Sequence, residues 1–398
     1  MKNYRMRPAA LAALLLAVCI ALSSCGVVGD YALRTYIRAR DIVLETDTET
    51  SADSEAASPA SSLFSTPGES SGGEDDGIKA PDVEGETSTP LMWHVTDPSS
   101  GGELYLLGSM HAGLEDMCLF PDEVYDAFDS CTALAVECDV IALEDDASVS
   151  VEGLRMLVYQ DGTSASDHID AGVYASALKI LEANGCPRSY MDSYVPILWQ
   201  QVIDEILTEQ TPYKYDNGVD RYFIKEAKRL EKTILEIEDP LDTYRGLASL
   251  SEKTQKQLLA DEVDPEYVSS FGDDMKTLYE VWKRGDEDEV NELLLGEKER
   301  ETDETAAAET DKTENAEKSA KDGDKTEEVD EVAACYDEYN KMMLGDRNEV
   351  MVKKAKEYLK KRMKVFYVVG LAHMVGDDGI VAQLEDHGCT VERVEYGK

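Results

Sequence analysis

Two segments near opposite ends of the folded part of the chain share one pattern, and this repeat limits the folds that the chain can adopt. Residues 104–111 read LYLLGSMH and residues 366–373 read FYVVGLAH. Each is a run of apolar residues that ends at a glycine, and a histidine follows three positions later. Unbroken apolar runs of this length are typical of strands buried in a parallel sheet. Since the chain has only five histidines, we interpret the repeat as two strands of one sheet that each present a histidine.

The position of the two histidines predicts a shared site. In open α/β sheets the working residues gather beyond the carboxyl ends of the strands. Gly108 and Gly370 permit a tight departure from the strand and a close approach of another backbone. A single histidine in such a context is more often structural, but two identical contexts favour a joint role for His111 and His373. We therefore expect the two strands to be neighbours, or nearly so, and the two histidines to open onto one cleft.

Three acidic residues follow other apolar strands. Glu137 ends the run LAVE, Asp139 lies two residues on along the same face, and Glu238 ends TILEIE. Burying a carboxylate is costly unless it is paired or used. Glu137 is therefore expected in the same cleft as His111 and His373. The alternative, a partly exposed acid that caps the next helix, remains open.

The segment LGDRNEVM, residues 344–351, opens or interrupts a long predicted helix. Its glycine and aspartate predict a kink or a cap that directs Arg347 and Asn348 sideways. An arginine in a site can clamp a carboxylate or a developing oxyanion. The alternative is an ordinary ion pair on the surface.

The N-terminus carries an export signal. A basic stretch at residues 2–7 precedes an apolar run at 9–22, which is too short for an ordinary membrane span. It ends in LSSC, which resembles a bacterial lipobox and implies cleavage before a lipidated Cys25. A plain secretory peptide or a short signal anchor is the alternative. We expect a signal peptide over 1–24, a lipidated Cys25 with a mostly disordered tether over 25–88, and attachment to the extracytoplasmic face of the cell membrane.

A second stretch of low complexity interrupts the remaining chain. Residues 297–331 are mostly acidic, polar or Ala, and we favour a disordered insertion over a charged helix. One domain over residues 89–398 remains, long enough for one sizeable core. The net charge of −44 argues against nucleic acid as a partner, because a phosphate backbone would be repelled. It leaves the oligomeric state open.

Six cysteines remain beyond the signal peptide and Cys25, and no two of them form a C-x-x-C pair, which argues against a structural zinc site. Three disulfides are conceivable outside the cell. We slightly favour buried free thiols, because the spacing shows no framework. The six are Cys118, Cys131, Cys138, Cys186, Cys335 and Cys389.

Strands and helices alternate at both ends of the folded part, with a helical block between them. This order predicts an α/β fold: a mixed sheet with flanking helices and a helical insert. Residues 91–95 and 103–109, separated by TDPSSGG, predict a β-hairpin. The other expected strands are 131–140, 231–239, 364–370 and 389–396, and the clearest helices are 121–130, 332–362 and 376–388.

Taken together, these motifs resemble the TraB/GumN family, which includes GumN-type lipoproteins, the pheromone-shutdown protein TraB and the Wnt-cleaving Tiki proteases. The resemblance spans residues 91–398 apart from the insertion. Ser109 departs from the usual Gly-Thr-x-His motif but keeps a hydroxyl. The residues that match the family's motifs are Gly108, His111, Glu137, Gly218, Asp220, Glu238, Arg347, Asn348, Gly370 and His373.

The resemblance implies a fold like that of erythromycin-esterase-like and ChaN-like proteins, and a hydrolase that acts on peptide bonds. His111, Glu137 and His373 would hold a divalent ion (Zn, Mn, Co or Fe) or act directly on a water. Arg347 would face the oxyanion, with Asn348 beside it, and Gly108, Gly370, Asp139, Asp220 and Glu238 would support the site. The alternatives are a lipoprotein that binds a peptide without turnover, with Arg347 on the peptide carboxylate, and a surface scaffold without a shared site.

Overall fold

The structure is a computed structural model that describes residues 77–145, 147–295 and 322–397. Its centre is a six-stranded mixed sheet in the order β4-β3-β5-β2-β1-β6. Residues 1–76 lie outside the described part, and with them the predicted signal peptide, Cys25 and most of the tether. The strands are β1 Met92–Thr96, β2 Glu103–Ser109, β3 Ala133–Val136, β4 Thr233–Glu236, β5 Lys364–Gly370 and β6 Thr390–Arg393.

The strand that ends at Gly108 and the strand that ends at Gly370 are direct neighbours. β2 and β5 run parallel, with Gly108 opposite Val369 and Ser109 opposite Gly370. β5 also pairs in parallel with β3, which in turn pairs with β4. The predicted hairpin is confirmed as the antiparallel pair β1 and β2, and β6 adds to β1 as an antiparallel edge. The carboxyl ends of β2, β3, β4 and β5 therefore meet at one edge of the sheet.

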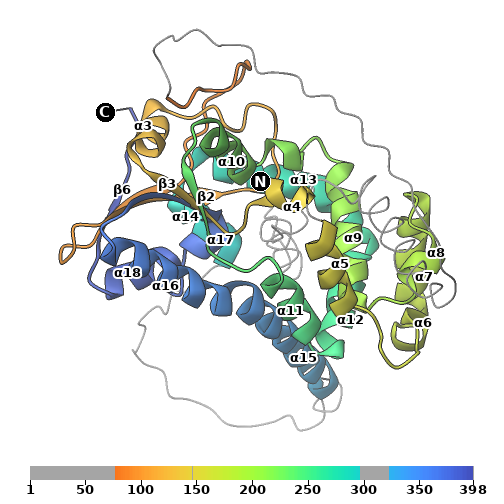
Figure 1. Cartoon of the computed structure of the whole chain (residues 1–398). Helices are drawn as coiled ribbons and strands as arrows, with labels where there is room; N and C mark the ends of the chain where they lie inside the picture. The colour runs from red at the N-terminus through yellow and green to blue at the C-terminus, as the bar shows by residue number, and fades with distance from the viewer. Residues whose placement is uncertain (1–76, 146, 296–321, 398) are drawn as a thin grey trace, which may run out of the picture.

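Helices cover both faces of this sheet. Figure 1 shows α3 and α10 on one side and α16 and α18 on the other. β5 lies between them with all but its first residue buried, which explains why its sequence is apolar without alternation. The helices around the sheet are α3 Asp122–Ser130, α4 Val140–Asp145, α10 Val219–Arg229, α16 Asp346–Lys360, α17 Leu371–Met374 and α18 Ile380–Asp386.

The helical insert forms a block beside the sheet (Figure 1). Its longest fully described helix, α13, begins with Asp264, which accepts hydrogen bonds from two backbone N–H groups, and Pro265. It ends at Gly285, whose φ of 61° suits a glycine. The block consists of α5 Ala147–Met156, α6 Ala165–His168, α7 Ala171–Ala183, α8 Arg188–Met191, α9 Pro196–Glu209, η2 Tyr215–Asn217, α11 Asp242–Ser249, α12 Glu252–Glu262, α13 Pro265–Arg284 and α15 Asp322–Asn340. α14 Glu287–Leu295 follows α13 and lies at the sheet in Figure 1.

Several element boundaries differ from the predicted ones. β3 is only four residues long, because the chain turns into α4 directly after the acids at its end. The last helix begins at Ile380 rather than at 376. Of the acidic stretch 297–331, residues up to 321 lie outside the described part, whereas 322–331 belong to α15. This helix therefore begins earlier than predicted.

The long helix predicted over 332–362 is interrupted. α15 and α16 are separated by η3, a π-helical turn at Lys341–Gly345, at the place where the sequence predicted a kink or cap. All six described cysteines are free thiols, as favoured, and all but Cys389 are buried. None of the helices in the described ranges is both long and apolar enough to cross a membrane.

Candidate functional site

The two repeated histidines lie just beyond adjacent strand ends. His111 follows β2 and His373 lies in α17, which follows β5, and their exposed fractions are 1% and 0%. Gly108 eases this packing, because a Cβ there would lie 2.6 Å from Cδ1 and 3.3 Å from the backbone Cα of Leu371. A Cβ on Gly218 would lie 2.3 Å from the carbonyl oxygen of His111. Both glycines therefore allow neighbouring backbone to close around the histidines.

His111 is oriented by a carboxylate. Its Nδ1 lies 2.7 Å from Oδ1 of Asp220, in the first turn of α10. Since a carboxylate only accepts hydrogen bonds, Nδ1 carries a proton, and Nε2 keeps its lone pair whenever the ring is neutral. Nε2 is buried and has no hydrogen-bond partner among the described residues. Burial lowers the pKa of His111, but the charge and hydrogen bond of Asp220 outweigh it and the pKa is raised overall.

His373 is oriented by an amide. Its Nδ1 lies 2.7 Å from Oδ1 of Asn348, whose Nδ2 donates to the backbone oxygen of Asp378 at 2.9 Å. That second bond fixes the amide so that its oxygen faces the ring, and Nδ1 of His373 is again the donor. Nε2 of His373 is buried and also lacks a partner in the part of the chain that the structure describes. Burial, the charge of Arg347 and the charge of His111 lower its pKa to about 3, so the ring is neutral.

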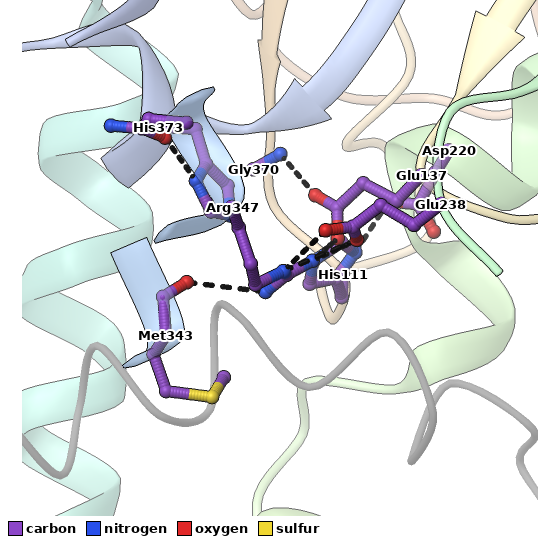
Figure 2. Close-up of polar contacts among 9 residues, drawn as sticks. His111, Glu137, Asp220, Glu238, Met343, Arg347, Gly370 and His373 are labelled. Atoms are coloured by element: carbon purple, nitrogen blue, oxygen red, sulfur yellow. Dashed lines mark hydrogen bonds and ion pairs between the residues drawn. The ribbon is translucent and has the colours of Figure 1, made fainter. Parts of the chain in front are cut away.

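Glu137 is tied to the backbone of β5 and to Arg347. Its Oε1 accepts from the backbone N–H of Gly370 at 2.8 Å, and its Oε2 accepts from Nη2 of Arg347 at 2.6 Å (Figure 2). Burial raises the pKa of Glu137, but the charges of Arg347 and of both histidines outweigh it and lower the pKa to about 2. Glu137 is thus ionised and lies within the electrostatic field of both histidines.

Arg347 lies between two carboxylates. Besides Glu137, its Nε and Nη2 donate to Glu238 at 2.9 and 2.6 Å, and its Nη1 donates to the carbonyl of Met343 at 3.4 Å (Figure 2). Burial raises the pKa of Glu238, opposed by the charge of Arg347. The guanidinium therefore links the ends of β3 and β4 to α16, and its Nε and Nη2 donate to protein carboxylates.

Arg347 and Asn348 are consecutive, yet they reach different partners in the same site. The π-helical turn η3 ends at Gly345, two residues before Arg347, and such turns add a residue to an α-helix and change its register. In this register Arg347 reaches two carboxylates and Asn348 reaches His373. Gly246 lets α11 close on this turn, since a Cβ there would lie 2.6 Å from Sδ of Met342.

The structure brings most of the predicted residues together, but Asp139 has another task. Its carboxylate forms an ion pair with Lys228 at 3.0 Å and accepts from the backbone N–H of Ala142 at 3.0 Å. Asp139 therefore caps the N-terminus of α4, which is the alternative that the sequence left open for the acids at the strand ends. Trp282 was not predicted as part of the site, yet its Nε1 donates to the carbonyl of Gly108 at 2.9 Å. In the sequence it looks like any core residue of an amphipathic helix.

Of the three expected ligands of a divalent ion, the two histidines are placed to bind one and Glu137 is not. Two buried Nε2 atoms with fixed Nδ1 partners fit two imidazole ligands of Zn, Mn, Co or Fe, since ligating histidines usually donate their other N–H to an oxygen. Glu137, the third expected ligand, has both oxygens engaged by Arg347 and Gly370. No cluster of three or more His, Cys, Asp or Glu placed to hold an ion occurs within 77–145, 147–295 and 322–397.

Comparison with known families gives one match. The profile of the TraB/PrgY/gumN family matches residues 91–393, which include every strand of the sheet and both Gly-x-x-His segments. Neither the curated proteins nor the solved structures contain a significant match.

Proposed function

The chain belongs to the TraB/PrgY/gumN family, and on this basis we propose that it is a hydrolase that cleaves peptide bonds at the His111–His373 site. The observation that carries the proposal is a pair of buried Nε2 atoms, each without a partner among the described residues. Each ring is fixed through Nδ1 by a different residue. Buried polar atoms are normally satisfied, so two orphaned lone pairs next to adjacent strand ends favour a reacting molecule as their partner.

The two rings suit different tasks, because their environments push their pKa values apart. Asp220 stabilises the protonated form of His111, so His111 is our candidate for the general base. In its neutral form its Nε2 would take a proton from the water as the water oxygen bonds to the carbonyl carbon. The resulting imidazolium would return that proton to the departing amine when the C–N bond breaks.

His373 stays neutral and offers a lone pair that can accept a hydrogen bond from the water or the substrate. A divalent ion bound by both Nε2 atoms would lower the pKa of a bound water and polarise the carbonyl. Without an ion His111 would act as the general base, and with an ion it would act as a metal ligand. Glu137 would serve either by adding negative charge beside both rings.

Arg347 has a supporting role in this proposal. Its Nε and Nη2 donate to Glu137 and Glu238, and its positive charge helps to keep His373 neutral. It also supplies a fixed positive charge that would stabilise an oxyanion on the substrate. A peptide binder that used Arg347 to hold a substrate carboxylate would have to displace one of these acids, so the structure favours hydrolysis over binding without turnover.

We also propose that the enzyme acts at the extracytoplasmic face of the membrane, anchored through a lipid on Cys25. The support is the N-terminal sequence alone, in which a basic stretch, a short apolar run and LSSC follow one another. The substrates would then be peptides or proteins outside the cytoplasm. A cleavage assay with peptides, combined with substitution of each histidine, tests the hydrolase proposal.

A further inference from the structure

Two acids lie in the interior of the helical block, away from the His111–His373 site. Asp204 is on α9 and Glu262 is the last residue of α12, a helix that packs along α9. Their exposed fractions are 1% and 0%. Neither oxygen of Asp204 has a hydrogen-bond partner within the described ranges, nor does Oε1 of Glu262. Gln200 donates to this pair, since its Nε2 lies 2.9 Å from Oε2 of Glu262.

No positively charged group among the described residues acts on either acid. The groups whose charge acts on Glu262 are Asp204 and Asp261, both of which disfavour its ionisation. The lysines and the arginine of α12 and α13 are not among the groups that act on the pair, and the titratable side chains near it are acids and phenols. They are Glu205 on α9, Asp261 on α12, Tyr215 on η2, Tyr267 on α13 and Tyr336 on α15.

Two ionised carboxylates cannot persist in such a place. Removing each from water costs several kcal/mol, and repulsion between them adds to that cost. A proton between them removes one charge and turns one carboxyl into a donor for the other. Burial raises the pKa of Asp204 to about 7, and burial together with the charge of Asp204 raises that of Glu262 well above its ordinary value.

We propose that Asp204 and Glu262 form a carboxylic acid–carboxylate pair that holds one proton between α9 and α12 and makes this helix pair sensitive to pH. The pair takes no part in the hydrolytic chemistry, and the proposal stands whether or not the chain is a hydrolase. At mildly acidic pH both carboxyls are protonated and the helices pack without a buried charge. As the pH rises through neutrality one proton leaves, and the interior must accommodate a carboxylate beside the remaining acid.

The helix pair is connected to the segment after His111. α9 ends at Glu209, and a few residues later Lys214 exchanges two backbone hydrogen bonds with Gly113, at 2.8 and 3.1 Å. Tyr215 follows directly, and its pKa is raised by burial and then by the charge of Asp204. A loosening of α9 at higher pH would therefore reach the backbone two residues from His111.

The test is thermal unfolding of the purified chain between pH 5 and pH 8. A folded-state pKa above the unfolded value near 4 means that the folded state holds the extra proton between these two values, so stability falls as the pH rises through this window. We expect the Tm of the wild type to drop by roughly 5 °C more over this range than that of Asp204→Asn, which is neutral at every pH. Glu209→Gln, a partly exposed acid of the same helix, is the control and should keep the wild-type slope.

A second variant and an infrared measurement test the proposal independently of the Tm of Asp204→Asn. Glu262→Gln should also flatten the curve, and the wild type at pH 6 should show infrared carbonyl absorption of protonated carboxyls that is weaker in Asp204→Asn. Parallel Tm curves for the wild type and both variants would overturn the proposal. So would a metal ion in the wild type that is lost in Asp204→Asn, because a cation would then occupy the place that we assign to the proton.

Discussion

The backbone N–H of Gly370 donates to Oε1 of Glu137 at 2.8 Å. This bond joins the end of β5, three residues before His373, to the acid that follows β3. Oε2 of the same carboxylate holds Arg347, so a single acid connects two strand ends and α16. The site is thus assembled from segments that are distant in sequence and meet only at the carboxyl edge of the sheet.

Replacing Arg347 by Ala should destabilise the protein strongly. Glu137 and Glu238 would both remain buried without their cation, and breaking such a pair typically costs about 3–5 kcal/mol. Urea unfolding monitored by circular dichroism measures the loss. The matched control is Arg245→Ala, which removes an exposed arginine paired with Asp242 and should change the stability by less than about 1 kcal/mol. Equal effects of the two substitutions would contradict the structure.

Acid should weaken the site through Glu137. Its pKa of about 2 lies below the ordinary value for a glutamate. The folded state therefore binds its proton less tightly, and the stabilisation is complete at neutral pH and is lost as the pH falls from about 4 towards 2. Glu137→Gln should be less stable than the wild type at pH 6 and should lose less on acidification to pH 3. A difference that stays constant between these pH values would show that Glu137 is not held as an anion.

The π-helical turn η3 should be needed for activity. Deleting Gly345 removes the extra residue and rotates α16 against α15 by about 100°, so Arg347 and Asn348 cannot both reach their partners. We expect loss of hydrolysis, and an altered Tm. Gly345→Ala keeps the length, and its new Cβ meets only Cγ of Lys341, at 3.9 Å, so this variant should remain active. A deletion variant with full activity would show that the turn is incidental.

Lipidation at Cys25 should determine where the protein resides. Cys25→Ala should release the chain from the membrane fraction or leave an unprocessed precursor there, because the acidic tether gives no electrostatic help at an anionic surface. Fractionation and immunoblotting of the tagged chain follow both species. Cys389→Ala is a control that leaves the N-terminus intact. Normal maturation and membrane attachment of Cys25→Ala would remove the lipoprotein assignment.

The sequence predicted the part of the site that depends on strand order. The repeated Gly-x-x-His pattern predicted that β2 and β5 are neighbours, and the structure confirms it. The residue types alone could not show that Asp220 orients His111 and Asn348 orients His373. Both partners come from helices, and the packing of these helices depends on the whole fold. Asp139 differs from Glu137 by two positions along one strand end, yet a nearby lysine and a helix N-terminus engage it.

The measurement that tests the central claim most directly is peptide cleavage by the purified chain and by four histidine variants. We expect the wild type to cleave members of a peptide library, and His111→Ala and His373→Ala each to abolish cleavage while the fold is retained. His387→Ala changes an exposed histidine at the end of α18 and should keep full activity. The double variant should be about as inactive as either single variant, because the two rings act as one unit. Full hydrolytic activity in both His111→Ala and His373→Ala would contradict the account.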